Sequence, residues 1–234
     1  MKVGVAVCDL FTGMFAANAA LAALAYRSRT GIGQHIDCAL LDSQISMLAN
    51  QSANWLNAEI CPDRMGNNHP SVVPYTVYEA KDGFVIIACG NDKQFIRLTA
   101  ALGIPALADD DDFSSNEARI KNRDRLDVML GDIIAKLDRV QVIDKLETAG
   151  GSCGPVNDIA EVLADPHVRA LGARVDKQRD DGSQISSTAF AAKLGVTPAQ
   201  YRTAPPRLGQ HNDQVMKEWA DLGADAVAAL RAAK

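Results

Sequence analysis

The chain has 234 residues, a formal net charge of −5 and a hydrophobic share of 47%, which is enough to fold around a substantial core. Its pI is about 5.4 and no basic run exceeds two residues, which argues against a nucleic-acid partner or a polybasic membrane anchor. It shows no leader pattern, and Asn18 interrupts the alanine-rich segment 14–26. We therefore predict a cytoplasmic protein without a membrane span.

The cysteines are odd in number and widely spaced, with no Cys-x-x-Cys pair and no histidine at ligand spacing. This pattern predicts buried thiols and no metal site. The cysteines are Cys8, Cys38, Cys61, Cys89 and Cys153. The consecutive acids 109–112 are expected to form a solvated loop, because one turn cannot direct all of these carboxylates at a single ion.

The first elements predicted are a short strand and a helix. Val3, Val5 and Val7 alternate as in a buried strand, and from Thr12 onward the residues are almost all helix formers, giving a helix over 12–28. Asp9 would then lie in the turn, near the positive end of the helix dipole and near unpaired backbone N–H groups. Asp9 or Thr12 capping the helix is the simpler interpretation. A reactive carboxylate at Asp9 is compatible with it.

A second strand and helix follow. Thr30 and Gly31 predict a left-handed end to the first helix. Residues 35–40 predict a short strand ending at Leu40, and residues 41–57 predict another helix, with Asp42 at its start as a capping candidate. A leucine at the end of a strand is usually core packing.

The segment 57–74 is polar, contains Gly and Pro, and lacks periodicity, which indicates a linker or a mobile loop. Gly66, Asn67 and Asn68 can present backbone N–H groups, so this loop could close over an acyl group and polarise its carbonyl. His69 is a candidate acid or base, although a solvent-facing loop histidine is the simpler interpretation.

The rest of the chain predicts a small module and a return segment. Strands are expected at 77–79 and 83–89, joined by the turn 81–83, and a helix at 92–102. One or two long amphipathic helices are expected within 115–149, covering the small sheet. A hinge is expected at 150–155. Strands at 172–177 and 186–190, an extended segment at 204–209 and a last helix through Trp219 complete the chain.

Several separated motifs, in the right order, resemble the middle and end of family III coenzyme A transferases, the group with formyl-CoA and carnitine CoA-transferases. They are Val-Gly-Val-Ala-Val-Cys-Asp-Leu-Phe-Thr-Gly-Met at 3–14, Arg-Ser-Arg-Thr-Gly-Ile-Gly-Gln-His-Ile-Asp-Cys-Ala-Leu-Leu-Asp at 27–42, Arg-Met-Gly-Asn-Asn-His-Pro at 64–70 and Ala-Pro-Pro-Arg-Leu-Gly-Gln-His at 204–211. Shorter matches are Pro74-Tyr75, Lys81-Asp-Gly83 and Gly90-Asn-Asp92. The resemblance covers nearly the whole chain.

The resemblance implies an α/β fold, the C-terminal part of the family fold, without the N-terminal Rossmann-like half that supplies most coenzyme A contacts. It implies a large-domain remainder with Asp9 at 1–60, a linker and active-site loop at 61–74, a small α+β domain at 75–150 and a return to the large domain at 151–234. Family members form interlocked dimers. The chain is thus expected to begin in mid-domain, as a fragment, a split subunit or a truncated remnant, and to associate as a homodimer or with a complementary N-terminal chain.

The resemblance also implies an activity. Asp9 would attack the thioester of an acyl-CoA and pass through aspartyl anhydride and thioester intermediates to a carboxylic acid acceptor. Leu40 sits where the family touches the coenzyme, and Gly66, Asn67, Asn68 and His69 match its active-site loop. No permanently bound cofactor or metal is implied; coenzyme A enters as a substrate thioester. An α-methylacyl-CoA racemase, or a chain inactive without its other half, remain alternatives.

Overall fold

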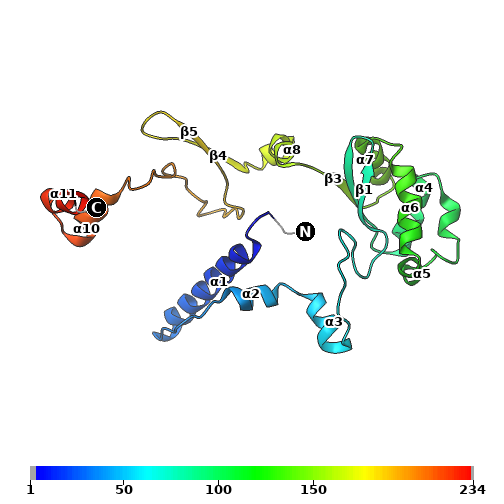
Figure 1. The fold of residues 1–234 in the computed structure, drawn as a ribbon, viewed down its shortest axis with the longest axis horizontal. Helices are drawn as coiled ribbons and strands as arrows, with labels where there is room; N and C mark the ends of the chain where they lie inside the picture. The colour runs from blue at the N-terminus through cyan, green and yellow to red at the C-terminus, as the bar shows by residue number, and fades with distance from the viewer. Residues whose placement is uncertain (1–3, 233–234) are drawn as a thin grey trace. The chain divides into compact units, whose positions relative to one another are not determined.

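The computed structural model describes residues 4–232, and the chain divides into two compact units, Met1–Pro70 and Ser71–Lys234. Each unit is described by itself. The helices of the first unit are α1 (Val7–Thr30), α2 (Leu40–Ser46) and α3 (Asn50–Ala58) (Figure 1). α1 ends as predicted, because Gly31 adopts a left-handed φ of 77° and its N–H binds the carbonyl of Arg27 at 2.8 Å.

The strand predicted before α1 is not formed in the described residues. Val5 lies in a bend and Val7 already begins the helix, while Val3 lies outside the described residues. Neither Asp9 nor Thr12 caps α1, since the N-cap is Ala6 and the Thr12 hydroxyl donates to the carbonyl of Cys8 at 2.7 Å. A strand needs a partner for its backbone groups, and residues 4–70 provide no strand to pair with. The prediction from alternation was wrong for this reason.

The same explanation applies to the strand predicted at 35–40. This segment lies between α1 and α2 without regular hydrogen bonding, although Ala39 keeps an extended backbone with φ −92° and ψ 147°. The single helix predicted at 41–57 is broken into α2 and α3 at Ala49, whose φ is 47°. Asp42 is the third residue of α2 and does not cap it, because the N-cap is Ala39.

The second unit opens with the hairpin that the sequence predicts. β1 (Tyr75–Ala80) and β2 (Gly83–Ala88) pair antiparallel, with Val77 opposite Ile86. Residues 150–155, expected to be a hinge, include a third strand: β3 (Cys153–Val156) pairs antiparallel with β2. In β1, Thr76, Tyr78 and Ala80 are buried while the alternate residues are more exposed. One face of this sheet therefore carries the core.

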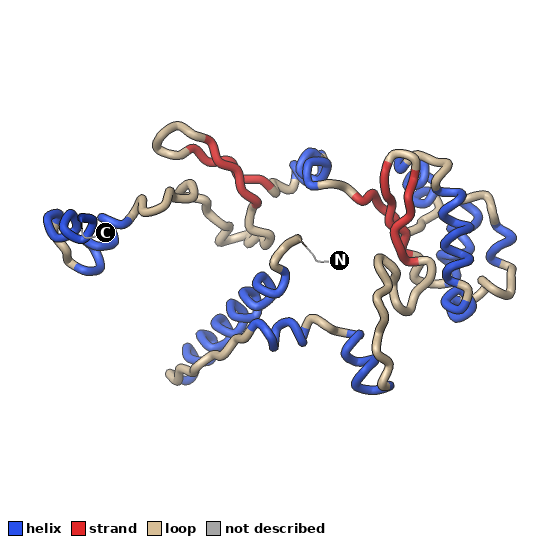
Figure 2. Tube along the Cα trace, in the orientation of Figure 1, coloured by secondary structure: helices blue, strands red, loops and turns tan. Residues whose placement is uncertain are grey.

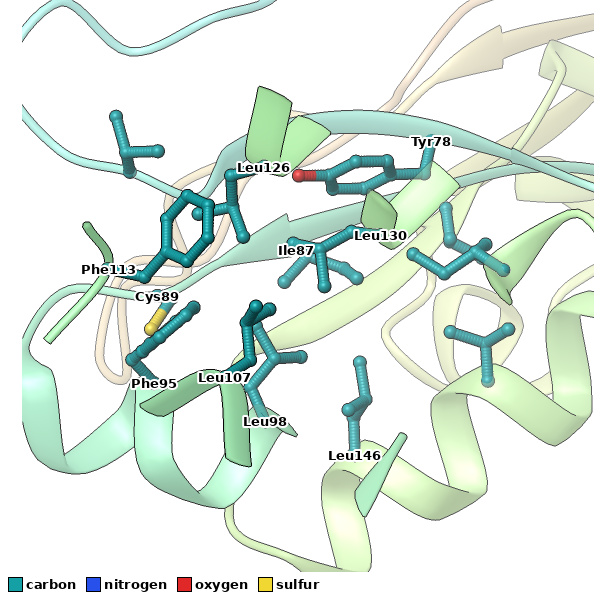
Figure 3. Packing of buried hydrophobic residues seen from close by; sticks show 14 of the residues in the cluster. Tyr78, Ile87, Cys89, Phe95, Leu98, Leu107, Phe113, Leu126, Leu130 and Leu146 are labelled. Carbon is teal, nitrogen blue, oxygen red and sulfur yellow. The ribbon is translucent and has the colours of Figure 1, made fainter. Parts of the chain in front are cut away.

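Helices cover that face. They are α4 (Asp92–Ala101), the 3₁₀ turn η1 (Pro105–Ala108), α5 (Asn116–Lys121), α6 (Arg123–Ile134) and α7 (Arg139–Thr148). The long amphipathic pattern is thus divided into shorter helices, and a capping box of Asp138 and Gln141 starts α7. Figure 3 shows Ile87 and Cys89 meeting Phe95, Leu98, Leu126 and Leu130 from the helices. The expectation that these helices cover the sheet is confirmed.

The remainder of the second unit consists of short helices and strands joined by long loops. Figure 2 draws the loops in tan. The elements are α8 (Ile159–Ala164), α9 (Pro166–Ala170), β4 (Arg174–Gln178), β5 (Gln184–Thr188), α10 (Asn212–Ala220) and α11 (Ala224–Ala232). β4 and β5 form the predicted antiparallel hairpin. The extended segment 204–209 lies against its turn, where Arg207 pairs with Asp181 and the Arg179 Nε donates to the carbonyl of Pro205 at 3.2 Å.

The cysteines are not all buried, so the sequence prediction was wrong for part of the set. Cys89 is buried, Cys8, Cys38 and Cys153 are half-buried, and Cys61 is exposed. Cys61 lies in the polar stretch 59–64, whose residues are all exposed. Burial raises the pKa of the Cys89 thiol to about 11.

We expect iodoacetamide at pH 8 to modify Cys61 roughly 100-fold faster than Cys89, because only the thiolate reacts and burial also blocks access to Cys89. Peptide mass spectrometry over a time course measures both rates in one sample. Comparable rates at the two positions would mean that the core around Cys89 opens readily.

α1 is long and apolar enough to cross a membrane by length and composition, contrary to the expectation from Asn18. Its 24 residues reach a mean hydropathy of 1.6 over the most apolar window, and none of them is buried. The core helix of a soluble protein, which is mostly buried, and a signal sequence, which lies near the N-terminus, pass the same test. One such helix is weak evidence for a membrane span.

Candidate functional site

Asp9 lies in the first turn of α1 as its only acidic side chain there, and it is exposed. The first N–H groups of a helix have no partner within the helix, and they carry the positive end of the helix dipole. Asp9 therefore shares the N-terminal turn with donors that favour negative charge. The sequence placed it in the turn before the helix; the structure places it inside the first turn, where this environment is retained.

Asp9 and Leu40 belong to segments that are in contact. The thiol of Cys8 donates to the carbonyl of Leu40 at 3.2 Å, and the thiol of Cys38 donates to the carbonyl of Thr12 at 3.6 Å. Leu40 begins α2 and its side chain is 51% exposed, so it is available to a ligand instead of filling a core. The N-terminal turns of α1 and α2 are thus brought side by side by two sulfur contacts.

A shallow cavity of about 200 Å³ lies beside this contact. It is lined by Phe15, Asp37, Cys38, Ala39, Asp42, Ser43 and Ser46. Ser43 is buried, and its hydroxyl donates to the carbonyl of Ala39 at 3.0 Å, which fixes the start of α2. The hollow therefore combines an apolar wall with carboxylates and hydroxyl groups.

The loop residues 66–69 form a tight turn in the first unit. Gly66 has a left-handed φ of 62°, and the N–H of Asn68 binds the carbonyl of Met65 at 3.1 Å. Gly66 and Asn67 are exposed, whereas Asn68 and His69 are half-buried. Among residues 4–232, no described hydrogen bond joins Gly66, Asn67 or Asn68 to α1. The structure thus joins the segment of Leu40 to that of Asp9.

Other titratable groups in unusual surroundings have structural roles. The hydroxyl of buried Tyr78 donates to Asp127 at 2.7 Å. Burial, followed by the Asp127 charge and hydrogen bond, raises the pKa of Tyr78 far above its usual range, and burial raises the pKa of Asp127. Tyr78 therefore stays protonated at neutral pH.

Within residues 4–232 no group of three or more His, Cys, Asp or Glu side chains is arranged to hold a metal ion.

Sequence reasoning missed the polar side chains that hold the downstream end of the loop 61–74. Asn116 and Arg119, one turn apart on α5, bind the backbone of Ser71 and Val73. Their spacing of three residues, just before an amphipathic helix, was the available signal. It does not distinguish such a contact from an ordinary exposed helix face.

Comparison with known proteins decides the family. The model of "CoA-transferase family III" matches residues 1–212. The chain belongs to CoA-transferase family III. The resemblance in the sequence motifs is thereby confirmed. The chain is 43% identical over 218 residues to a succinate–glutarate CoA-transferase of Agrobacterium fabrum, and the match covers 93% of this chain and 54% of that protein.

Further relatives agree. A succinyl-CoA:glutarate CoA-transferase of Mus musculus is 34% identical over 93% of this chain and 50% of its own length. The crystal structure of a CaiB/BaiF family protein from Brucella suis matches 93% of this chain and 56% of that chain, with a TM-score of 0.78 at 38% identity. The expected α/β family fold is confirmed. The chain spans about half the length of the curated relatives it matches.

Proposed function

We propose that this family III chain carries the nucleophile of a CoA-transferase that exchanges coenzyme A between short dicarboxylic acids such as succinate and glutarate. The observation that carries the proposal is the carboxylate of Asp9 in the first turn of α1, beside Leu40, in a chain 43% identical to a succinate–glutarate CoA-transferase. The names of the relatives favour transfer over the racemase alternative.

Asp9 acts as a covalent nucleophile in this mechanism. Its carboxylate attacks the thioester carbonyl, the carbon–sulfur bond breaks, and coenzyme A leaves as the thiolate while a mixed anhydride forms on Asp9. The thiolate then attacks the aspartyl carbonyl, which releases the donor acid and leaves a thioester on Asp9. The acceptor carboxylate reverses the two steps and leaves as the new acyl-CoA. Atoms balance without a redox step or a permanently bound cofactor.

The surroundings of Asp9 suit this chemistry. Unpaired N–H groups of the α1 turn stabilise the oxyanion that develops when the thioester carbonyl is attacked. Leu40 offers an exposed apolar contact for the coenzyme. The turn of Gly66, Asn67, Asn68 and His69 closes over the acyl group and supplies further backbone donors. This closure is a proposal and rests on the conformation of the turn and on its match to the family loop.

The complete enzyme is proposed to work in the cytoplasm as an assembly of two chains, either as a homodimer or with a complementary N-terminal chain. The first unit supports this: α1 has no buried residue and exposes Leu10, Phe11, Met14, Phe15 and Leu21. Large apolar side chains exposed along one unburied helix favour a surface that another polypeptide covers.

Covalent labelling tests the role of Asp9. We expect succinyl-CoA, with hydroxylamine as the trap, to convert the Asp9 carboxyl to a hydroxamate in the tryptic peptide 3–27, in which Asp9 is the only acidic side chain. Intact-mass and peptide mass spectrometry measure the modification. Asp9→Asn should abolish it, because an amide cannot form the anhydride.

Asp132→Asn is the control, since Asp132 on α6 is an exposed carboxylate like Asp9 and does not line the cavity beside the Cys8–Leu40 contact. It should label like the unsubstituted chain. Labelling is measured with the chain alone and with a complementary N-terminal half. Modification that persists in Asp9→Asn, or none in any combination, contradicts the proposal.

A further inference from the structure

The downstream end of the loop 61–74 is held by the first residue of α5. The side-chain oxygen of Asn116 accepts from the N–H of Val73 at 3.1 Å, and its side-chain nitrogen donates to the carbonyl of Ser71 at 2.9 Å. A primary amide that pairs with both an N–H and a carbonyl fixes the direction of a peptide segment as well as its position. The N-terminus of α5 does not need Asn116 as a cap, because the Ser115 hydroxyl oxygen already accepts from the N–H of Ala118 at 3.2 Å.

Arg119 continues the same contact into the core. Its Nε donates to the carbonyl of Val73 at 2.7 Å, its Nη1 to the carbonyl of Phe113 at 2.9 Å and its Nη2 to Asp92 at 2.7 Å. The side chain is fully buried and lies over the ring of Phe95, 4.4 Å from its centroid. Because the guanidinium is planar with donors in fixed directions, three acceptors leave it no freedom to move. Val73 is thereby tied to α4, α5 and the core.

We propose that Asn116 and Arg119 are positioning residues that fix residues 71–73, the exit of the loop, and so hold the turn 66–69 in one conformation. We call this set of contacts the 71–73 clamp. Only Pro70 separates the turn from the clamped segment along the chain. The catalytic part of the inference rests on the proposed function, in which the turn closes over the acyl group. A loop fixed at its exit has fewer conformations from which to close, so less ordering is required during the reaction.

Hydrogen exchange tests the clamp without any assumption about activity. We expect Asn116→Ala to accelerate exchange of the Val73 amide at least about tenfold, the size expected for two neutral hydrogen bonds. The Asn68 amide, which closes the turn by binding Met65, should accelerate as well. Asn116→Asp keeps the acceptor for the Val73 N–H and should restore most of the protection at Val73.

Asn122→Ala is the matched control. Asn122 follows the same helix, and its side chain donates to the carbonyls of Asp112 at 3.1 Å and Ala118 at 3.0 Å, not to the loop. It should leave exchange at Val73 and Asn68 unchanged. Unchanged exchange at Asn68 in Asn116→Ala, or equal acceleration in Asn122→Ala, overturns the clamp.

Kinetics separate positioning from structure in whichever assembly transfers coenzyme A. Asn116→Ala should lower kcat about tenfold and change KM for the acyl-CoA less than about twofold, because the loss lies in ordering the loop and not in binding the coenzyme. An unchanged kcat despite faster exchange at Asn68 overturns the positioning role. If Asn116→Ala accelerates exchange as expected but Asp9 is never labelled, the result supports the clamp and contradicts the proposed function. Failure of the clamp and failure of the proposed function are therefore distinguishable.

Discussion

Replacing Arg119 by methionine is expected to lower the free energy of unfolding of the module formed by β1–β3 and α4–α7 by about 3–5 kcal/mol. The change removes the donors for the carbonyls of Val73 and Phe113 and for Asp92. A buried acceptor left without a partner costs about 1–3 kcal/mol, and methionine only partly refills the space over Phe95. Asp92 contributes less, because its side chain is 55% exposed and water replaces the guanidinium.

The measurement is urea-dependent hydrogen exchange of core amides in β2, which reports the stability of this module without contributions from the rest of the chain. Arg125→Met is the matched control. Arg125 also pairs with an aspartate, Asp112, and also lies over a phenylalanine, Phe113, but its side chain is 51% exposed. Its replacement should cost less than about 1 kcal/mol. Equal losses in the two variants would show that Arg119 stabilises the module no more than a surface ion pair.

The module was largely predictable from sequence because its signals are local. The turn Lys81-Asp82-Gly83 between two apolar runs specifies a hairpin, and the four-residue spacing of Leu126, Leu130 and Ile134 specifies a helix that packs on it. The third strand was not predicted. Residues 153–156 contain Gly154 and Pro155, which are typical of turns, and their pairing with β2 is a long-range contact that no short pattern reports.

The first unit was less predictable because many of its apolar side chains are exposed in the part of the chain that the structure describes. Their alternation therefore does not mark a buried face. Val5 and Ile36 alternate with their neighbours as in strands, yet both are exposed and neither pairs in a sheet. The family motifs were sufficient to single out Asp9 and Leu40. Their segments are in contact through the thiols of Cys8 and Cys38, a long-range feature that no spacing rule reports. The roles of Asp9 and Leu40, like those of the turn 66–69, stay predictions.

Amides of α1 are expected to exchange at least about 1,000-fold faster than amides of β2 when the chain is studied alone. α1 is rich in helix formers, but none of its residues is buried, so little opposes its opening besides its own hydrogen bonds and the contacts of its first turns with residues 38–40. An isolated helix without tertiary packing is marginal in water, whereas β2 carries the fully buried Val85 and the 2%-exposed Ile87. The expected ratio of the α1 and β2 exchange rates follows because β2 opens only when its module unfolds, which costs roughly 5 kcal/mol or more.

A covering polypeptide should remove this difference. Exchange is measured by mass spectrometry for the chain at increasing concentration, and at fixed concentration with the N-terminal half of a family III relative. Protection of α1 that rises with the added half, while β2 stays constant, identifies that half as the cover; protection that rises with concentration alone identifies a second copy. Because Asp9 lies in the first turn of α1, the same titration should increase hydroxamate formation at Asp9 in parallel. Full protection of α1 in the dilute chain would contradict the need for any cover.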